Sequence, residues 1–163
     1  MSYLFYVGDK VVYPMQGIGI VEGIEEKDFS GEKQQYYIIK MLTNNMDIMI
    51  PSKRLETSNI RLISDASTLE DVLFNFHTKE WDSEDVPSSK ERYQVNMDKI
   101  KSGALEDIVE VVYYLTHMNK EKSLNSSEKQ MLQNVRKSLI DEMSLIKKIT
   151  EKEAEKLLNA NIS

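Results

Sequence analysis

The sequence has no cysteine among its 163 residues. Disulfide scaffolds, iron–sulfur clusters, thiolate zinc sites and thiol nucleophiles are therefore excluded. No apolar run approaches the roughly 18–20 residues that a helix needs to cross a bilayer. The first residues, from Met1 to Tyr6, carry neither the basic segment nor the small-residue cleavage site of a signal peptide. We therefore expect a cytoplasmic protein with no membrane partner.

The groups on which enzymes depend are also missing. The two histidines, His77 and His117, lie far apart with no His-Glu-x-x-His spacing, and we interpret each as an ordinary surface or helix-face residue. The glycines from Gly17 to Gly23 resemble a dinucleotide fingerprint, but Glu22 stands where the third glycine belongs. We expect no enzymatic activity, no catalytic residue, no metal, no cofactor and no small-molecule substrate.

Basic side chains are in the minority. The chain has 21 Lys and Arg against 27 Asp and Glu, for a formal net charge of −6. The imbalance is −1 for residues 1–64 and −5 for residues 65–163. Because a protein that binds nucleic acid by itself is usually basic, this charge excludes strong DNA binding by the free protein. It does not exclude a local basic patch.

Glycine is scarce and unevenly placed, since five of the six glycines lie in the first 31 residues. The same part of the chain contains short alternating or β-branched runs, which predict strands. Turn residues separate these runs at Ser30-Gly31 and at 43–45, and glycines inside strands indicate bulges or sharp bends. Five such strands predict a small, strongly bent antiparallel β-barrel. The runs are Lys10–Tyr13, Ile18–Val21, Tyr36–Ile39, Ile48–Ile50 and Ile60–Ile63.

From Ser67 onward the apolar residues recur with a helical period. Four of the predicted helices are preceded by a capping box, in which Ser or Thr is followed three residues later by Glu or Gln. An acidic stretch at 77–87 predicts a loop or linker between the first two helices. The capping boxes begin at Ser67, Ser88, Ser127 and Thr150.

Strands and helices are thus segregated along the chain, which predicts an α+β protein of two packed modules and not an alternating α/β sheet. We expect residues 1–64 to form the barrel, 65–87 a helix and linker, and 88–163 an all-α domain. With enzymatic chemistry absent, two joined modules suggest a binding protein in which one module anchors and the other acts.

The two halves of the chain together carry a recognisable pattern. In the first half its segments are Val7–Pro14, Gly17–Val21, Ile24, Lys40, Ile50-Pro51 and Ile60–Ile63. Those of the second half are Arg92-Tyr93, Lys99–Gly103, Glu110–Val112, Leu115 and Ser127–Leu132. With these segments the sequence closely resembles the CarD/CdnL family of bacterial transcription regulators, whose barrel also opens the polymerase-binding module of transcription-repair coupling factors.

The resemblance implies a Tudor-like barrel of the SH3 kind that binds the β subunit of RNA polymerase, largely by aligning strands. Lys27 at the hairpin and Met49 in the strand before Pro51 match the family's polymerase contacts. A basic residue is usual at both positions, so Met49 departs from the pattern. Strand addition at Met49 and Ile50 still needs only backbone groups. The polymerase-binding residues that we expect are Lys27, Met49, Ile50 and Pro51.

The resemblance further implies that the helical domain stabilises the promoter open complex at the upstream edge of the −10 region. In the family a tryptophan wedges into the minor groove and basic neighbours hold phosphates. Such a wedge costs roughly a few kcal/mol of unstacking, and tethering through polymerase allows a weak DNA contact. The matching positions are Ser89, Lys90, Arg92, Tyr93 and Lys129. Ser89 stands at the wedge position, and Glu91 replaces a basic residue.

The only tryptophan, Trp81, lies in the acidic stretch, and its role has two interpretations. It could be a relocated wedge that reaches the same groove, or it could pack against a domain as large aromatics usually do. Its neighbours Glu80 and Asp82 would be repelled by phosphate, which favours packing. A second function class also stays open, a protein–protein adaptor on polymerase with no direct DNA contact. In either class the −5 charge of the helical half indicates that polymerase recruits this protein, and not DNA.

Overall fold

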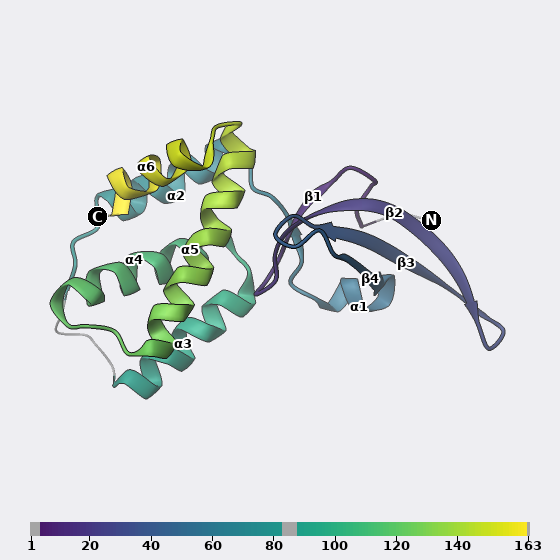
Figure 1. The fold of residues 1–163 in the computed structure, drawn as a ribbon, viewed down its shortest axis with the longest axis horizontal. Helices are drawn as coiled ribbons and strands as arrows, with labels where there is room; N and C mark the ends of the chain where they lie inside the picture. Colours follow the sequence, from purple (N-terminus) through teal and green to yellow (C-terminus); the bar gives the residue numbers. More distant parts are fainter. Residues whose placement is uncertain (1–3, 83–87, 163) are drawn as a thin grey trace. The chain divides into compact units, whose positions relative to one another are not determined.

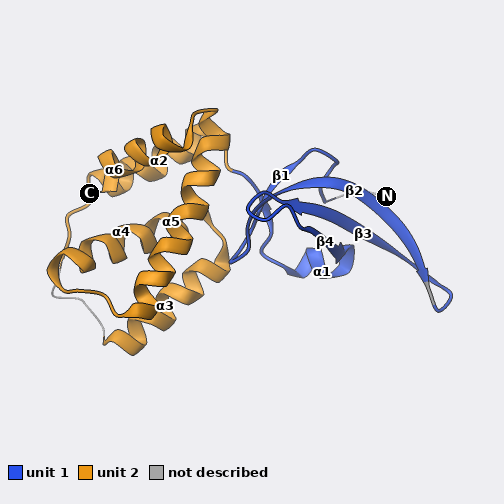
Figure 2. Ribbon diagram, viewed as in Figure 1, with its two compact units in different colours: residues 1–63 blue, residues 64–163 orange. Residues whose placement is uncertain are grey.

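The computed structural model describes residues 4–82 and 88–162. The chain divides into two compact units, residues 1–63 and residues 64–163 (Figure 2). Among these described residues, the first unit contains the strands and one short helix, and the regular elements of the second are helices alone (Figure 1). The predicted α+β organisation, with the strands first and the helices after them, is confirmed.

The first unit is built on one antiparallel sheet with the strand order β4-β3-β2-β1-β5. All five predicted strands are present, and the second and third extend well beyond the runs that predicted them, as one long curved hairpin (Figure 1). The strands are β1 (Lys10–Tyr13), β2 (Gly17–Phe29), β3 (Glu32–Met41), β4 (Asp47–Pro51) and β5 (Arg61–Leu62), and helix α1 (Ser52–Thr57) lies between the last two.

Local backbone features shape the long hairpin of β2 and β3. Ser30 and Gly31 have φ values of 53° and 85°, which is the geometry of a two-residue type I′ turn. The register shifts between Val21 and Gly23, so Glu22 forms a bulge that bends the strand. The predicted turn and the predicted glycine-marked bulge are thus both present.

The side chains that alternate toward the inside of the sheet form a separate apolar core. On β3, for example, Tyr37, Ile39 and Met41 are buried while the residues between them are partly exposed. The other members of this core are Phe5, Val11, Val21, Ile50, Leu55 and Ile60.

The part of the second unit that the structure describes contains five helices, and α4 packs against α2, α3 and α5. Its core includes Leu69, Val72, Leu73 and Phe76 of α2, so the region expected to be a lead-in helix and linker contributes to this core directly. The part of the predicted linker at 83–87 lies outside the described residues. The helices are α2 (Ala66–His77), α3 (Ser89–Ser102), α4 (Leu105–Glu121), α5 (Ser126–Lys147) and α6 (Glu151–Ile162).

Two of the four predicted helix starts are displaced by two residues. Asp65, not Ser67, caps α2 by accepting a hydrogen bond from the amide of Thr68, and Asn125, not Ser127, caps α5. Asp and Asn stabilise a helix N-terminus at least as well as Ser does. The earlier residue of each run is therefore the N-cap. Ser88 caps α3 as predicted.

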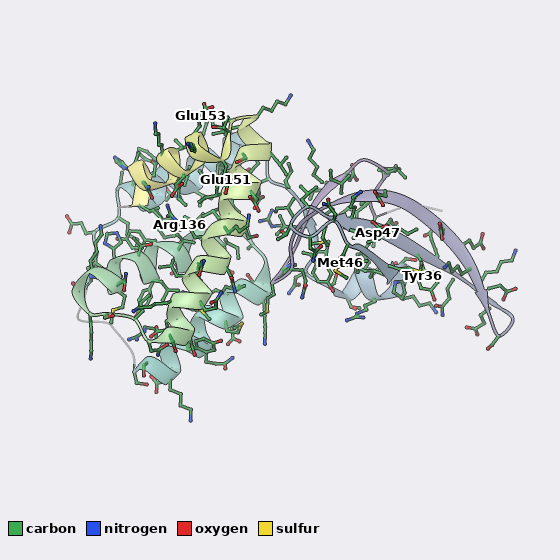
Figure 3. All side chains as sticks on the ribbon, in the orientation of Figure 1. Tyr36, Met46, Asp47, Arg136, Glu151 and Glu153 are labelled. Carbon is green, nitrogen blue, oxygen red and sulfur yellow. The ribbon has the colours of Figure 1, made fainter. Side chains whose placement is uncertain are left out.

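The predicted capping box at the start of α6 is reciprocal. The Thr150 hydroxyl accepts from the Glu153 amide at 3.1 Å, and the Glu153 carboxylate accepts from the Thr150 amide. Arg136 of α5, labelled in Figure 3, donates to Asn159 of α6 at 2.7 Å and so holds the two helices together.

The two units are connected at Ile63 and Ser64, whose backbone amides are both hydrogen-bonded. The Ile63 amide donates to the carbonyl of Lys10 at 3.0 Å, within the sheet unit. The next amide, that of Ser64, donates to the carboxylate of Glu142 at 3.0 Å, within the helical unit. Glu142 is buried on α5. Both backbone groups at the junction are therefore fixed, each by its own unit.

No helix in the described residues is long and apolar enough to span a membrane. In the same part of the chain, His, Asp and Glu side chains form no group of three that could hold a metal ion.

Candidate functional site

The outer edge of β4 is open, since within the described residues β4 pairs only with β3. The Met41 amide donates to the Met46 carbonyl at 2.9 Å where the two strands begin to pair. In an antiparallel pair every second residue bonds across, so Ile48 and Ile50 bond to β3. The amide and carbonyl of Met49 consequently point away from the sheet. They offer a partner strand both a donor and an acceptor.

Lys27 and Met49 lie on the same face of the sheet. Lys27 pairs with Gln34, Met49 pairs with Ile38, and residues an even number apart on β3 point to the same side. Tyr36, labelled in Figure 3, lies between them on β3. The Met49 side chain is 44% exposed. The structure therefore brings these two candidates to one face.

Ile50 and Pro51 are placed differently. The Ile50 side chain is 4% exposed and belongs to the core of the sheet unit, and its backbone bonds to β3. Neither its side chain nor its backbone groups are therefore accessible to a partner strand. Pro51 pairs with Tyr36 and is the N-cap residue of α1. Because proline lacks an amide hydrogen, Pro51 ends the edge that a partner strand can follow.

In the helical unit, Arg92 of α3 and Glu128 of α5 form a buried ion pair. Arg92 Nε and Nη2 donate to the two carboxylate oxygens of Glu128 at 2.5 and 2.6 Å. Arg92 is 9% exposed and Glu128 is 0% exposed. The hydrogen bonds to Glu128 raise the pKa of Arg92, so its guanidinium stays ionised. The guanidinium is occupied inside the unit and does not face solvent.

This ion pair joins the first turns of two helices. Arg92 lies three residues after Ser89, where α3 begins, and Glu128 lies in the first turn of α5. These two joined turns contain three exposed candidate residues, Ser89 and Lys90 of α3 and Lys129 of α5. Helix N-termini and lysines both attract phosphate. The structure thus brings three of the candidate DNA contacts to one end of the helical unit.

Tyr93 is partly buried and packs against the core of the helical unit. Of the residues expected to face DNA in α3, Ser89 and Lys90 are therefore exposed, whereas Arg92 and Tyr93 are packed inward. Glu91 is exposed in the same turn and reduces its positive charge.

Trp81 packs on α4 by both its ring and its indole nitrogen. Its ring stacks on that of His117 with centroids 5.3 Å apart, and it meets Tyr114 edge-on at 5.4 Å. Its Nε1 donates to the Glu121 carboxylate at 2.8 Å. The segment that carries Trp81 is also held by the Tyr113 hydroxyl, which donates to the Lys79 carbonyl at 3.2 Å. This arrangement is the packing expected of an anchor for the acidic segment.

Sequence reasoning did not single out Glu128, Tyr114 or Asn96. In the sequence Glu128 has the position of a capping-box residue, so the pattern gives no sign that it pairs with Arg92. Tyr114 lies near the pair, and burial raises the pKa of its hydroxyl. The Tyr114 hydroxyl and the amide nitrogen of Asn96 on α3 are buried without a hydrogen-bond partner among the described residues. Two tyrosines in succession at 113–114 and a polar Asn96 between apolar positions were the available signals.

Two family models match this chain. The model described as "CarD-like/TRCF RID domain" matches residues 5–64, which includes β4 and its open edge. The model described as "CarD, C-terminal domain" matches residues 72–159, which includes the joined first turns of α3 and α5. The two matches cover the sheet unit and most of the helical unit.

A curated relative agrees with these models. YdeB of Bacillus subtilis (strain 168), described as a candidate transcription factor, is 48% identical over 150 residues, or 92% of this chain and 97% of YdeB. A solved structure of CdnLNt from Myxococcus xanthus is 45% identical, covers 34% of this chain and 79% of its own, and aligns with a TM-score of 0.31. CarD-family transcription regulators are not enzymes. On the two family models and the near full-length identity to YdeB, the chain belongs to the CarD family.

Proposed function

We propose that this protein binds the β subunit of RNA polymerase through the open edge of β4 and stabilises the promoter open complex through its helical unit. The observation that carries the proposal is the outward-pointing backbone of Met49, on a strand within the region that matches the RID model. RID denotes an RNA polymerase-interaction domain. Backbone strand addition needs no particular side chain, so the absence of a basic residue at Met49 does not oppose it.

The DNA contact in this proposal is weak and depends on tethering. Ser89, Lys90 and Lys129 supply the exposed surface at the upstream edge of the −10 region, where they meet the minor groove and its phosphates. The wedge position holds the small Ser89, which unstacks no base step. With −5 charge on residues 65–163, the helical unit binds DNA appreciably only when polymerase holds it there.

The direct experiment is promoter opening with purified cognate polymerase. We expect the protein to lengthen the lifetime of the open complex, and Ser89→Trp to lengthen it further because the wedge is restored. A wild-type protein that leaves the lifetime unchanged would refute the proposal. No gain from Ser89→Trp would refute only the view that the wedge is attenuated.

The polymerase contact has its own test. Met49→Pro removes the outward amide of β4 without removing a bond to β3, so we expect binding to the isolated β subunit to fall about tenfold or more. Lys27→Glu should also weaken it. The matched control is Met15→Ala, which removes an exposed methionine elsewhere in the sheet unit. Wild-type binding by both Met49→Pro and Lys27→Glu would move the contact away from this face.

A second candidate function is a polymerase adaptor that never touches DNA. The inward packing of Arg92, Tyr93 and Trp81 favours it, because three expected DNA contacts are engaged inside the unit. Salt dependence distinguishes the two. A contact to phosphates weakens by about 0.9 logarithmic units per phosphate for each tenfold rise in salt, whereas an apolar protein contact does not.

A further inference from the structure

The geometry of Arg92 is that of an internal crosslink. Nε and Nη2, on one side of its guanidinium, donate to the two carboxylate oxygens of Glu128, at 2.5 and 2.6 Å. With 9% of its surface exposed, the side chain has little left to present to a phosphate. Arg92 is nevertheless a position at which resemblance to the family predicts a DNA contact. Its role therefore needs another physical explanation.

The pair fixes one helix start against another. The Glu128 amide donates to Asn125, the N-cap of α5, at 2.9 Å, so the residue that holds Arg92 is itself part of the cap. On α3 the cap Ser88 lies four residues before Arg92. A shift of either first turn would break the pair or a cap. The relative position of Lys90 and Lys129, one on each turn, is consequently set by this pair.

Loss of either charge of the pair is expected to be costly. Asn96 of α3 and Tyr114 of α4 each place a buried polar atom without a hydrogen-bond partner among the described residues, and the Tyr114 hydroxyl lies within electrostatic range of both charges. Loss of one partner would leave the other as an uncompensated buried charge. An apolar pair of similar volume can replace both, since removing the two charges together leaves none unpaired.

We propose that Arg92 supports DNA binding through Glu128, as a positioning residue that aligns the first turns of α3 and α5, and not by contacting a phosphate. Lys90 and Lys129 make the phosphate contacts. This inference rests on the proposed function for its effect on promoter DNA. Its structural part, the alignment of the two turns by the pair, stands without polymerase.

The test compares Arg92→Met with the double variant Arg92→Met/Glu128→Met and with Lys90→Met, all in the full chain. We expect Arg92→Met to lower the melting temperature by about 10 °C or more and to shorten the open-complex lifetime to that seen without protein. The double variant should recover both. Lys90→Met should keep the melting temperature but reduce the salt slope of the lifetime by about one phosphate.

The salt slope decides between positioning and contact. A stable double variant that still has a short lifetime, with its salt slope reduced as in Lys90→Met, would show that Arg92 touches DNA and would overturn the proposal. Arg92→Lys covers the case in which the double variant does not fold. Lysine keeps the charge but not the fork, so we expect lower stability with an unchanged salt slope. Wild-type stability in Arg92→Lys would also overturn the proposal.

Hydrogen exchange separates this inference from the proposed function. In Arg92→Met the amides of the first turns of α3 and α5 should lose protection together, and in the double variant they should regain it. If wild-type protein has no effect on promoter opening but exchange follows this pattern, the proposed function fails while the alignment stands. Unchanged protection in Arg92→Met would refute the alignment itself.

Discussion

The two units of this protein handle polar and apolar groups in opposite ways. Among the described residues, eight of the ten exposed large apolar side chains lie in the sheet unit, whereas the buried charged residues Arg92, Glu128 and Glu142 all lie in the helical unit. The sheet unit keeps apolar surface and backbone hydrogen-bonding groups at its outside. The helical unit uses its charges internally and presents a polar exterior.

This difference indicates two kinds of recognition. In the proposed function a partner strand pairs with the backbone of the β4 edge, so side chains such as Met49 can vary without loss of that pairing. A charged helical surface is read by the positions of its side chains, so the helical unit depends on its internal alignment. Substitutions should therefore damage the two units through different routes, and the following predictions test that separation.

The largest expected effect is on the helical core. Leu115 is fully buried on α4, so Leu115→Ala should lower the free energy of unfolding of the helical unit by about 2–5 kcal/mol. Trp81 is the only tryptophan and packs on α4, so its fluorescence during urea titration reports this unit alone.

The amides of β2 and β3 should keep their exchange protection in Leu115→Ala, since the sheet unit has its own core. Leu42→Ala, which removes an exposed leucine after β3, is the matched control and should change stability by less than about 0.5 kcal/mol. Joint loss of protection in both units would show that they unfold as one and would break the comparison.

A smaller effect is expected from Trp81. Trp81→Ala removes the ring contacts with Tyr114 and His117 and the hydrogen bond to Glu121, which should cost about 1–3 kcal/mol, measured by circular dichroism in urea. Phe74→Ala, at an exposed aromatic residue of α2, should cost about 0.5 kcal/mol or less.

Open-complex lifetime gives Trp81 its functional test. For a packing residue we expect the lifetime at saturating protein and moderate temperature to be unchanged by Trp81→Ala. A shortened lifetime with unimpaired stability would instead make Trp81 a relocated wedge.

The smallest effect is a pH dependence at His117. Burial lowers the pKa of His117 below its usual 6.5, although a hydrogen bond to the Ile162 backbone and the charge of Glu121 raise it, and Lys120 lowers it further. The unfolded chain therefore takes up a proton first as pH falls, so stability is lost from about pH 6.5 down through the folded pKa.

Because the His117 ring is only partly buried, solvent screening keeps this loss to roughly a few tenths of a kcal/mol. Urea unfolding at pH 7.5 and pH 5.5 measures it, and His117→Gln should remove the difference. An equal acid loss in the variant would assign the dependence to carboxylates.

Much of the architecture was predictable because local signals were strong. Alternation along β3 and the positive-φ turn at Ser30-Gly31 predict the hairpin, and apolar periodicity predicts the helices. Two helix starts were misplaced because Asp65 and Asn125 compete with the serines that follow them. Sequence spacing does not decide between two residues, two positions apart, that can both cap.

The candidate site was less predictable because it depends on contacts between distant residues. Met49, Lys90 and Lys129 are exposed and Lys27 is partly exposed, as local patterns and the family resemblance suggest. Arg92 is different, since its partner Glu128 is 36 residues away and looks like an ordinary cap in the sequence. A basic residue at a position where the family resemblance implies a DNA contact can thus form a buried ion pair instead. Only the tertiary structure distinguishes the two roles.

The junction between the units has a consequence for proteolysis. A protease needs an extended stretch of backbone free of hydrogen bonds to seat in its active site. From β5 to α2 the chain offers the bonded amides of Ile63 and Ser64 and then Asp65, whose carboxylate holds the start of the helix. Limited digestion should therefore leave this connection intact while the Ser64 amide is hydrogen-bonded to Glu142. In a Glu142→Leu variant this connection should be the first site of cleavage.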